Sequence, residues 1–175
     1  MIDLMLNNGT AGLFDLNINQ QMKMLEASTW NYQLLDHSMF VLMGNPREGQ
    51  TLDEVRGLLL GEIEKLKKGD FSDDLLPSVI NNLKLRYYNS LESNEERVGE
   101  YVDAFINGTP WEQIVKSLDR MEGMTKQQIM DFANRHFNDS YVTVFKRQGV
   151  DPNQKKIDKP EITAPTDTTV VGPEA

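Results

Sequence analysis

The stretch TLDEVRGLLLGEIEKLKKG, residues 51–69, opens the part of the chain that decides the fold. Thr51 and Glu54 form a capping-box pattern, in which a hydroxyl and a carboxylate each satisfy a backbone N–H at a helix start. Apolar residues then recur at helical spacing on one face, and three lysines precede Gly69, which favours a helix end. These residues predict one amphipathic helix from Thr51 to Lys68.

Four similar patterns and one strand follow this helix. Pro77 is tolerated only within a first turn, so the second helix should begin just before it. The predicted elements are helices over 72–91, 93–107, 109–118 and 125–137, and a strand over 141–146. The helix residues expected to face the core are Val98, Tyr101, Val102, Phe105, Trp111, Ile114, Val115, Leu118, Ile129, Phe132, Ala133 and Phe137.

The region before residue 51 predicts a short helix end and a β-hairpin. Ile2–Leu6 reads as the last turns of a helix, and alternating side chains predict strands over 22–29 and 37–43, joined by 30–36. Four methionines lie on these strands, where they either fill a core or form a soft peptide-binding surface. They are Met22, Met24, Met39 and Met43.

Composition narrows the class of protein. The chain has 175 residues, enough for one ordinary domain, and a net charge of -9, which would repel nucleic acid and anionic membranes. It has no cysteine, which excludes disulfide scaffolds, thiol nucleophiles and cysteine-based zinc sites. No apolar run reaches the roughly 20 residues of a spanning helix. We therefore expect neither nucleic acid nor a membrane as a partner.

The order of elements predicts an α+β fold, in which amphipathic helices pack on one face of an antiparallel sheet. Residues 1–149 should form this unit, which lacks strands on its N-terminal side. Residues 150–175 are rich in proline and threonine and carry no periodicity, so they predict a linker or disordered tail.

Several segments together resemble the insulinase/pitrilysin (inverzincin) family of zinc metallopeptidases. They are Gly9-Thr-Ala-Gly-Leu-Phe-Asp-Leu16, Gly49–Val55, Leu66–Gly69, Leu91–Arg97, Asp103–Gly108, Thr125–Asn134 and Tyr141–Gly149. The resemblance implies the later part of a non-catalytic α/β unit, in a parent that closes two halves around a peptide chamber. It also implies zinc in the parent's catalytic domain, and that domain and peptide substrate as partners.

The residues of the family's chemistry are absent from this chain. A zinc site of this type needs His-x-x-Glu-His on one helix, whereas the chain has only His37 and His136, neither in that pattern. The family's substrate-contacting Arg and Tyr stand seven residues apart; Tyr101 matches, but Asn94 replaces the Arg. We therefore assign no catalytic, cofactor or metal residue, expect no cofactor in this chain, and read Tyr101 as a core aromatic.

Two functions follow as hypotheses. The first is a non-catalytic fragment of a zinc metallopeptidase that walls the chamber and helps position peptide; the chain alone would be inactive. The alternative is a stand-alone scaffold with the same fold and no proteolysis.

The glutamates around Arg97 predict a solvated face with local ion pairs, namely Glu92, Glu95, Glu96 and Glu100. Because the unit is incomplete, self-association is expected near the 22–43 hairpin.

Overall fold

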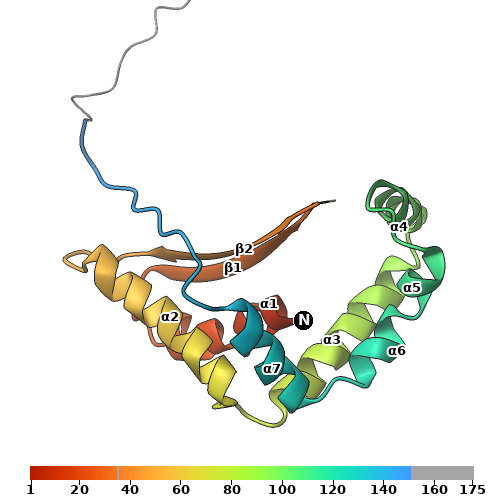
Figure 1. Cartoon of the computed structure of the whole chain (residues 1–175), viewed down its shortest axis with the longest axis horizontal. Helices are drawn as coiled ribbons and strands as arrows, with labels where there is room; N and C mark the ends of the chain where they lie inside the picture. Colours follow the sequence, from red (N-terminus) through yellow and green to blue (C-terminus); the bar gives the residue numbers. More distant parts are fainter. Residues whose placement is uncertain (35, 151–175) are drawn as a thin grey trace, which may run out of the picture. The chain divides into compact units, whose positions relative to one another are not determined.

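The computed structural model describes residues 1–34 and 36–150. Figure 1 shows a two-stranded antiparallel hairpin over a set of helices, which makes the fold α+β, as predicted. The elements in chain order are α1 (Ile2–Leu6), the π-helical turn η1 (Asp15–Asn19), β1 (Glu26–Gln33), β2 (Ser38–Asn45), α2 (Leu52–Lys68), α3 (Leu75–Ser90), α4 (Asn94–Ile106), α5 (Trp111–Val115), α6 (Ser117–Glu122) and α7 (Lys126–His136).

One face of the hairpin packs against helices. Trp30 pairs with Val41 on one face, and Thr29, one step along, points to the other. On that other face Thr29 Oγ1 donates a hydrogen bond of 2.6 Å to Asp3 Oδ1 of α1. Gly44 lies so near α2 that an added Cβ would meet an α2 side chain at 2.5 Å. The helices therefore cover the Thr29 face, as the sequence predicts.

The predicted strand 22–29 begins only at Glu26. Glu26 pairs with Asn45, the last residue of β2, and the next residue in the chain is Pro46. Proline has no backbone N–H to continue the ladder, which ends with a hydrogen bond of 2.8 Å from Leu25 N to the Asn45 carbonyl oxygen. Met22 instead takes a left-handed conformation with φ of 49°. The prediction was wrong over the first half of this strand.

The predicted connection 30–36 is also too long. Its first half belongs to β1, which continues to Gln33 opposite Ser38. The hairpin closes with a hydrogen bond of 3.1 Å from Leu34 N to the His37 carbonyl oxygen. The connection is therefore shorter than predicted.

A buried carboxylate organises the loop between α1 and η1. Asp15 is 5% exposed. It accepts hydrogen bonds of 2.7 to 3.0 Å from the backbone N–H groups of Asn8, Gly9 and Gly12 and from Asn7 Nδ2. A carboxylate with this many donors compensates its loss of hydration. The interaction closes the loop.

This loop delivers part of the core that the sequence analysis did not predict. An added Cβ at Gly12 would collide with the Leu6 carbonyl oxygen, so only glycine allows the loop to lie against α1. Phe14 and Ile18 then lie fully buried. The other members of the core include Met5, Leu6, Met24, Ala27, Leu59, Ile63, Leu66, Val79, Ile129 and Ala133.

The capping predictions for α2 and α7 are confirmed. Both halves of the capping box form between Thr51 and Glu54 and between Thr125 and Gln128. Gly69 ends α2 with φ of 71°, a conformation that favours glycine. Each cap contributes about 1 kcal/mol and fixes where its helix begins.

Lys126 connects the start of α7 to the segment between α2 and α3 through hydrogen bonds. Lys126 Nζ donates to Asp73 Oδ1 at 2.8 Å and to the Phe71 carbonyl oxygen at 3.0 Å. It also lies 4.6 Å from the centre of the Phe71 ring. The hydrogen bond from Lys126 lowers the pKa of Asp73.

The remaining helices follow the predicted order with one difference. Pro77 lies in the first turn of α3, as predicted. The predicted helix 109–118 is two short helices, α5 and α6, which meet at Lys116. An ion pair between Lys84 and Glu122 joins α3 to α6. Among the described residues, no helix combines the length and apolar content needed to cross a bilayer.

The predicted strand 141–146 forms no ladder in the described residues. Val142 and Val144 are 88% and 86% exposed, respectively. A segment with strand periodicity forms a ladder only when a neighbouring strand supplies hydrogen-bond partners. The only sheet in the described residues contains β1 and β2 alone. The prediction of a paired strand was therefore wrong for this chain by itself.

The chain divides into two compact units, Met1–Thr143 and Val144–Ala175. In the described part of the second unit, the Arg147 guanidinium lies 6.0 Å from the centre of the Phe145 ring. The predicted linker over 150–175 lies outside the described residues except for its first position. That part of the domain prediction stays a prediction.

We expect Asp15→Ala to lower the free energy of unfolding by about 3 kcal/mol, because several donors would lose a charged acceptor in a buried loop. Urea unfolding followed by circular dichroism measures the loss. Asp139→Ala, at an exposed position, is the matched control and should change stability little. Equal effects of the two substitutions would contradict the role given to Asp15.

Candidate functional site

The two histidines do not form a metal site in the structure. Both His37 and His136 are exposed, and His136 packs against the Phe132 ring with 4.2 Å between ring centres. Within residues 1–34 and 36–150, no group of three His, Asp or Glu side chains could hold a metal ion. His136 occupies the last position of α7, where a basic residue interacts favourably with the helix dipole.

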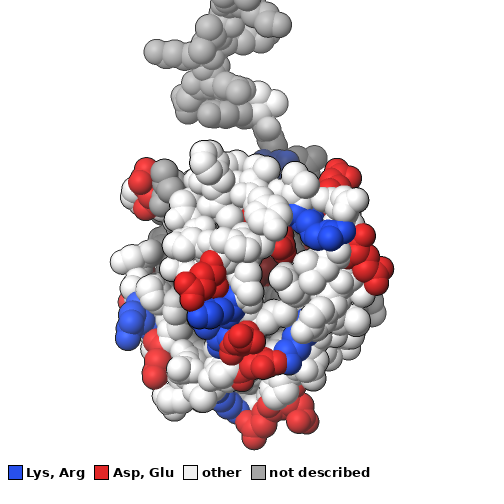
Figure 2. Space-filling model, turned by 90° about the vertical axis from the view of Figure 1, so that its right-hand side faces the viewer, with Lys and Arg blue, Asp and Glu red and all other residues white. Residues whose placement is uncertain are grey.

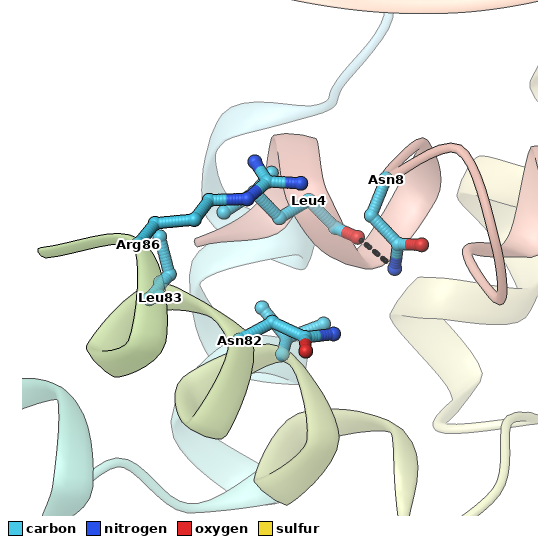
Figure 3. A pocket seen from close by; sticks show the side chains of 6 residues that line it. Leu4, Asn8, Asn82, Leu83 and Arg86 are labelled. Carbon is cyan, nitrogen blue, oxygen red and sulfur yellow. Dashed lines mark hydrogen bonds between the residues drawn. The ribbon is translucent and has the colours of Figure 1, made fainter. Parts of the chain in front are cut away.

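Two depressions on the surface offer little room or chemistry. A cavity of about 10 Å³ between α1 and α3 has space for about one water. Figure 3 shows Asn8 turned back so that its Nδ2 donates to the Leu4 carbonyl oxygen at 2.9 Å, with Asn82 and Arg86 of α3 beside it. These polar groups line a packing gap between two helices.

The second depression, of about 390 Å³, opens beside the start of α2. Its polar groups already serve the local structure. The Glu54 carboxylate accepts from Thr51 N at 2.8 Å, and Gln50 Nε2 donates to the Lys23 carbonyl oxygen at 2.9 Å. The hydrogen bond from the Thr51 backbone lowers the pKa of Glu54. This depression is a consequence of the helix cap.

The most distinctive surface lies on α4 and α5. We call it the α4–α5 apolar surface. Its side chains are between 38% and 88% exposed. They are Val98, Tyr101, Val102, Phe105, Ile106, Trp111 and Val115. Figure 2 views the molecule from this side and shows a broad area without charged side chains in its upper half, above a band of mixed charge.

All of these residues except Ile106 were predicted to face the core, and that prediction was wrong. The helical spacing is real, but α4 packs mainly on the short helix α5, so Ala104 is its only buried residue. Phe105 is 88% exposed. Periodicity shows which residues share a face, but not what covers that face. Contiguous exposed apolar side chains of this kind mark interaction surfaces.

Two aromatic rings give this surface a fixed centre. The rings of Tyr101 and Trp111 stack with 4.2 Å between centres and 25° between planes. Tyr101 is therefore an exposed, stacked aromatic rather than the predicted core residue. The stack connects α4 to α5.

Burial, together with nearby Glu100, raises the pKa of Tyr87 on the neighbouring helix α3.

The predicted ion pairs around Arg97 do not form as expected. Arg97 donates to Asn94 Oδ1 at 2.6 Å and to the Ser93 carbonyl oxygen at 3.4 Å. Ser93 also caps α4 by accepting from Glu96 N. The nearby glutamates are solvated, as predicted, but the arginine bonds to the start of its own helix. Asn94 thus takes part in local structure.

The uncovered face of the hairpin carries further apolar side chains. Trp30, Tyr32, Met39 and Val41 share this face. Trp30 and Tyr32 meet edge to face with 6.4 Å between ring centres. The Trp30 Nε1 atom is buried and has no hydrogen-bond partner among the described residues. A buried indole N–H usually has one, so Trp30 is an exception in this fold.

The four methionines separate into different environments. Met24 is 2% exposed and belongs to the core, whereas Met22 and Met39 are 71% and 54% exposed. Met43 is half-buried on the uncovered face of the hairpin. Of the two alternatives, the core interpretation holds for Met24 and is wrong for the other three, because Met22 lies outside the strand and Met39 and Met43 face away from the helices.

The fold is shared with a known protease. No family model and no curated protein matches the sequence. The chain is similar in structure to a protease from Helicobacter pylori, with a TM-score of 0.73 and 19% sequence identity over 79% of this chain and 33% of that chain. At this identity the likeness shows the fold alone. The chain spans about one third of that protease.

We expect Phe105→Ser to change the free energy of unfolding by less than about 0.5 kcal/mol, because the side chain leaves little apolar area buried. Phe14→Ala, in the core, should lower it by about 3 to 5 kcal/mol. Urea unfolding of both variants measures the contrast. A large loss from Phe105→Ser would place this side chain in the core.

We expect the chain by itself to bind no zinc stoichiometrically, because His-x-x-Glu-His is absent. Metal analysis of protein purified without chelators or affinity metals tests this. One tightly held zinc per chain, lost in His37→Ala or His136→Ala, would contradict it.

Proposed function

We propose that this chain is a non-catalytic part of a zinc metallopeptidase of the insulinase/pitrilysin type. It walls a peptide chamber and helps to position peptide, while another part of the parent protein holds the metal. The observation that carries the proposal is the shared fold with one third of a protease. The described residues do not fit zinc themselves, because they bring no three ligands together.

The uncovered surfaces support a larger assembly. The α4–α5 apolar surface is rich in aromatic side chains, which are enriched in the cores of protein interfaces. The uncovered hairpin face carries Tyr32 and Met39, which are 51% and 54% exposed. The catalytic domain of the parent would cover apolar area at both surfaces. Without that partner, we propose that the chain self-associates through these surfaces.

The test is reconstitution with the catalytic part. A reading frame that encodes His-x-x-Glu-His, continuous with this chain or adjacent to it, supplies that polypeptide. Adding the present chain should raise kcat/KM for a quenched fluorescent peptide by about tenfold, since positioning a substrate lowers the barrier. Phe105→Ser should reduce this gain, and Phe132→Ser, exposed on α7, is the matched control.

Light scattering gives a second readout of the same experiment. The isolated chain should form oligomers as its concentration rises, and the catalytic polypeptide should suppress them. If the chain stays monomeric and leaves peptide hydrolysis unchanged, the proposal fails. The alternative of a stand-alone scaffold with this fold would then be favoured.

A further inference from the structure

The chain contains the tripeptide Asn-Gly-Thr twice, at residues 8–10 and 107–109. In both copies the glycine has a positive φ, 82° at Gly9 and 60° at Gly108. Neither glycine has another atom within 4 Å of the position of an added Cβ. The two copies therefore share covalent structure and a glycine with positive φ, and they differ in the hydrogen bonds around them.

The first copy is held on both sides of the Asn8–Gly9 bond. Asn8 Oδ1 accepts from Thr10 N at 3.0 Å and from Ala11 N at 2.9 Å. The Gly9 N–H donates to the buried carboxylate of Asp15 at 2.9 Å. Hydrogen bonds to an ionised acceptor are about twice as strong as neutral ones. This amide nitrogen is held away from the Asn8 side chain.

The second copy lies at the junction of α4 and α5 and is held more weakly. The Gly108 N–H donates to the neutral Phe105 carbonyl oxygen at 3.2 Å. Asn107 Nδ2 donates to the Asp103 carbonyl oxygen at 2.9 Å. Among the described residues, no hydrogen bond to Asn107 Oδ1 is found. The Asn107 side chain is thus fixed at one atom only.

We propose that Asn107 is a site of spontaneous deamidation. A base removes the proton of the Gly108 backbone nitrogen, and this nitrogen attacks Asn107 Cγ. The bond from Cγ to Nδ2 breaks, and ammonia leaves with the proton that it gains from solvent. Water then opens the cyclic imide to aspartate or isoaspartate. Water is the only co-reactant, and no oxidant or metal is required.

The product changes the end of α4. The hydrogen bond from Asn107 to the Asp103 carbonyl oxygen is lost with the amide group. A carboxylate takes its place beside the last carbonyl groups of the helix, where negative charge is unfavourable. The modification therefore loosens the connection that holds the stacked Tyr101 and Trp111 rings in register.

Peptide mapping by mass spectrometry during incubation in mildly alkaline buffer tests the proposal. In the folded chain, conversion at Asn107 should be about fivefold faster than at Asn8, because a stronger hydrogen bond protects the Gly9 nitrogen. In denaturant the two tripeptides should convert at similar rates, which is the internal control. Equal rates in the folded chain, or faster conversion at Asn8, would overturn the proposal.

The variant Asn107→Asp tests the structural consequence without waiting for the reaction. Hydrogen exchange of the amides of residues 105–108 should be faster than in the unmodified chain, while exchange in α2 stays the same. Unchanged exchange at the end of α4 would show that the new charge has no effect there.

Discussion

The buried carboxylate of Asp15 gathers the backbone between α1 and η1, and the rest of the first unit is built on that loop. Two asparagines of η1, Asn17 and Asn19, then form hydrogen bonds to two different elements. Asn19 holds both backbone groups of Ala27, with hydrogen bonds of 2.9 and 2.8 Å, and so fixes β1. Asn17 donates to Glu62 of α2 at 2.7 Å. The hairpin and the longest helix are thus positioned from one short segment.

Sequence patterns predicted the features that depend on neighbouring residues. The helix starts at Thr51 and Thr125 and the stop at Gly69 follow from groups within one turn, so the printed sequence contains all the partners. The end of the hairpin ladder depends on where Pro46 falls in the opposite strand, which alternation alone does not reveal. The role of Asp15 needs a loop whose shape no periodicity encodes.

The candidate site was misread for a physical reason. An apolar stripe on a helix has the same spacing whether a core or a separate polypeptide covers it. Val98, Tyr101, Val102 and Phe105 therefore looked like core residues, although α4 has little to pack against. The sequence predicted one helix over 109–118 after this stripe, whereas the structure has the short helix α5 (Trp111–Val115) there, which is too small to cover the stripe.

The sequence from Tyr141 to Phe145, which joins no strand ladder in the described residues, has a consequence for aggregation. Five residues of high β-propensity without charge are a template for unwanted strand addition between chains. Lys146 and Arg147 follow directly, and charged residues at the end of such a run act as gatekeepers against aggregation. The positive charges of these two residues repel the same residues on other copies of the chain, which disfavours strand addition between copies.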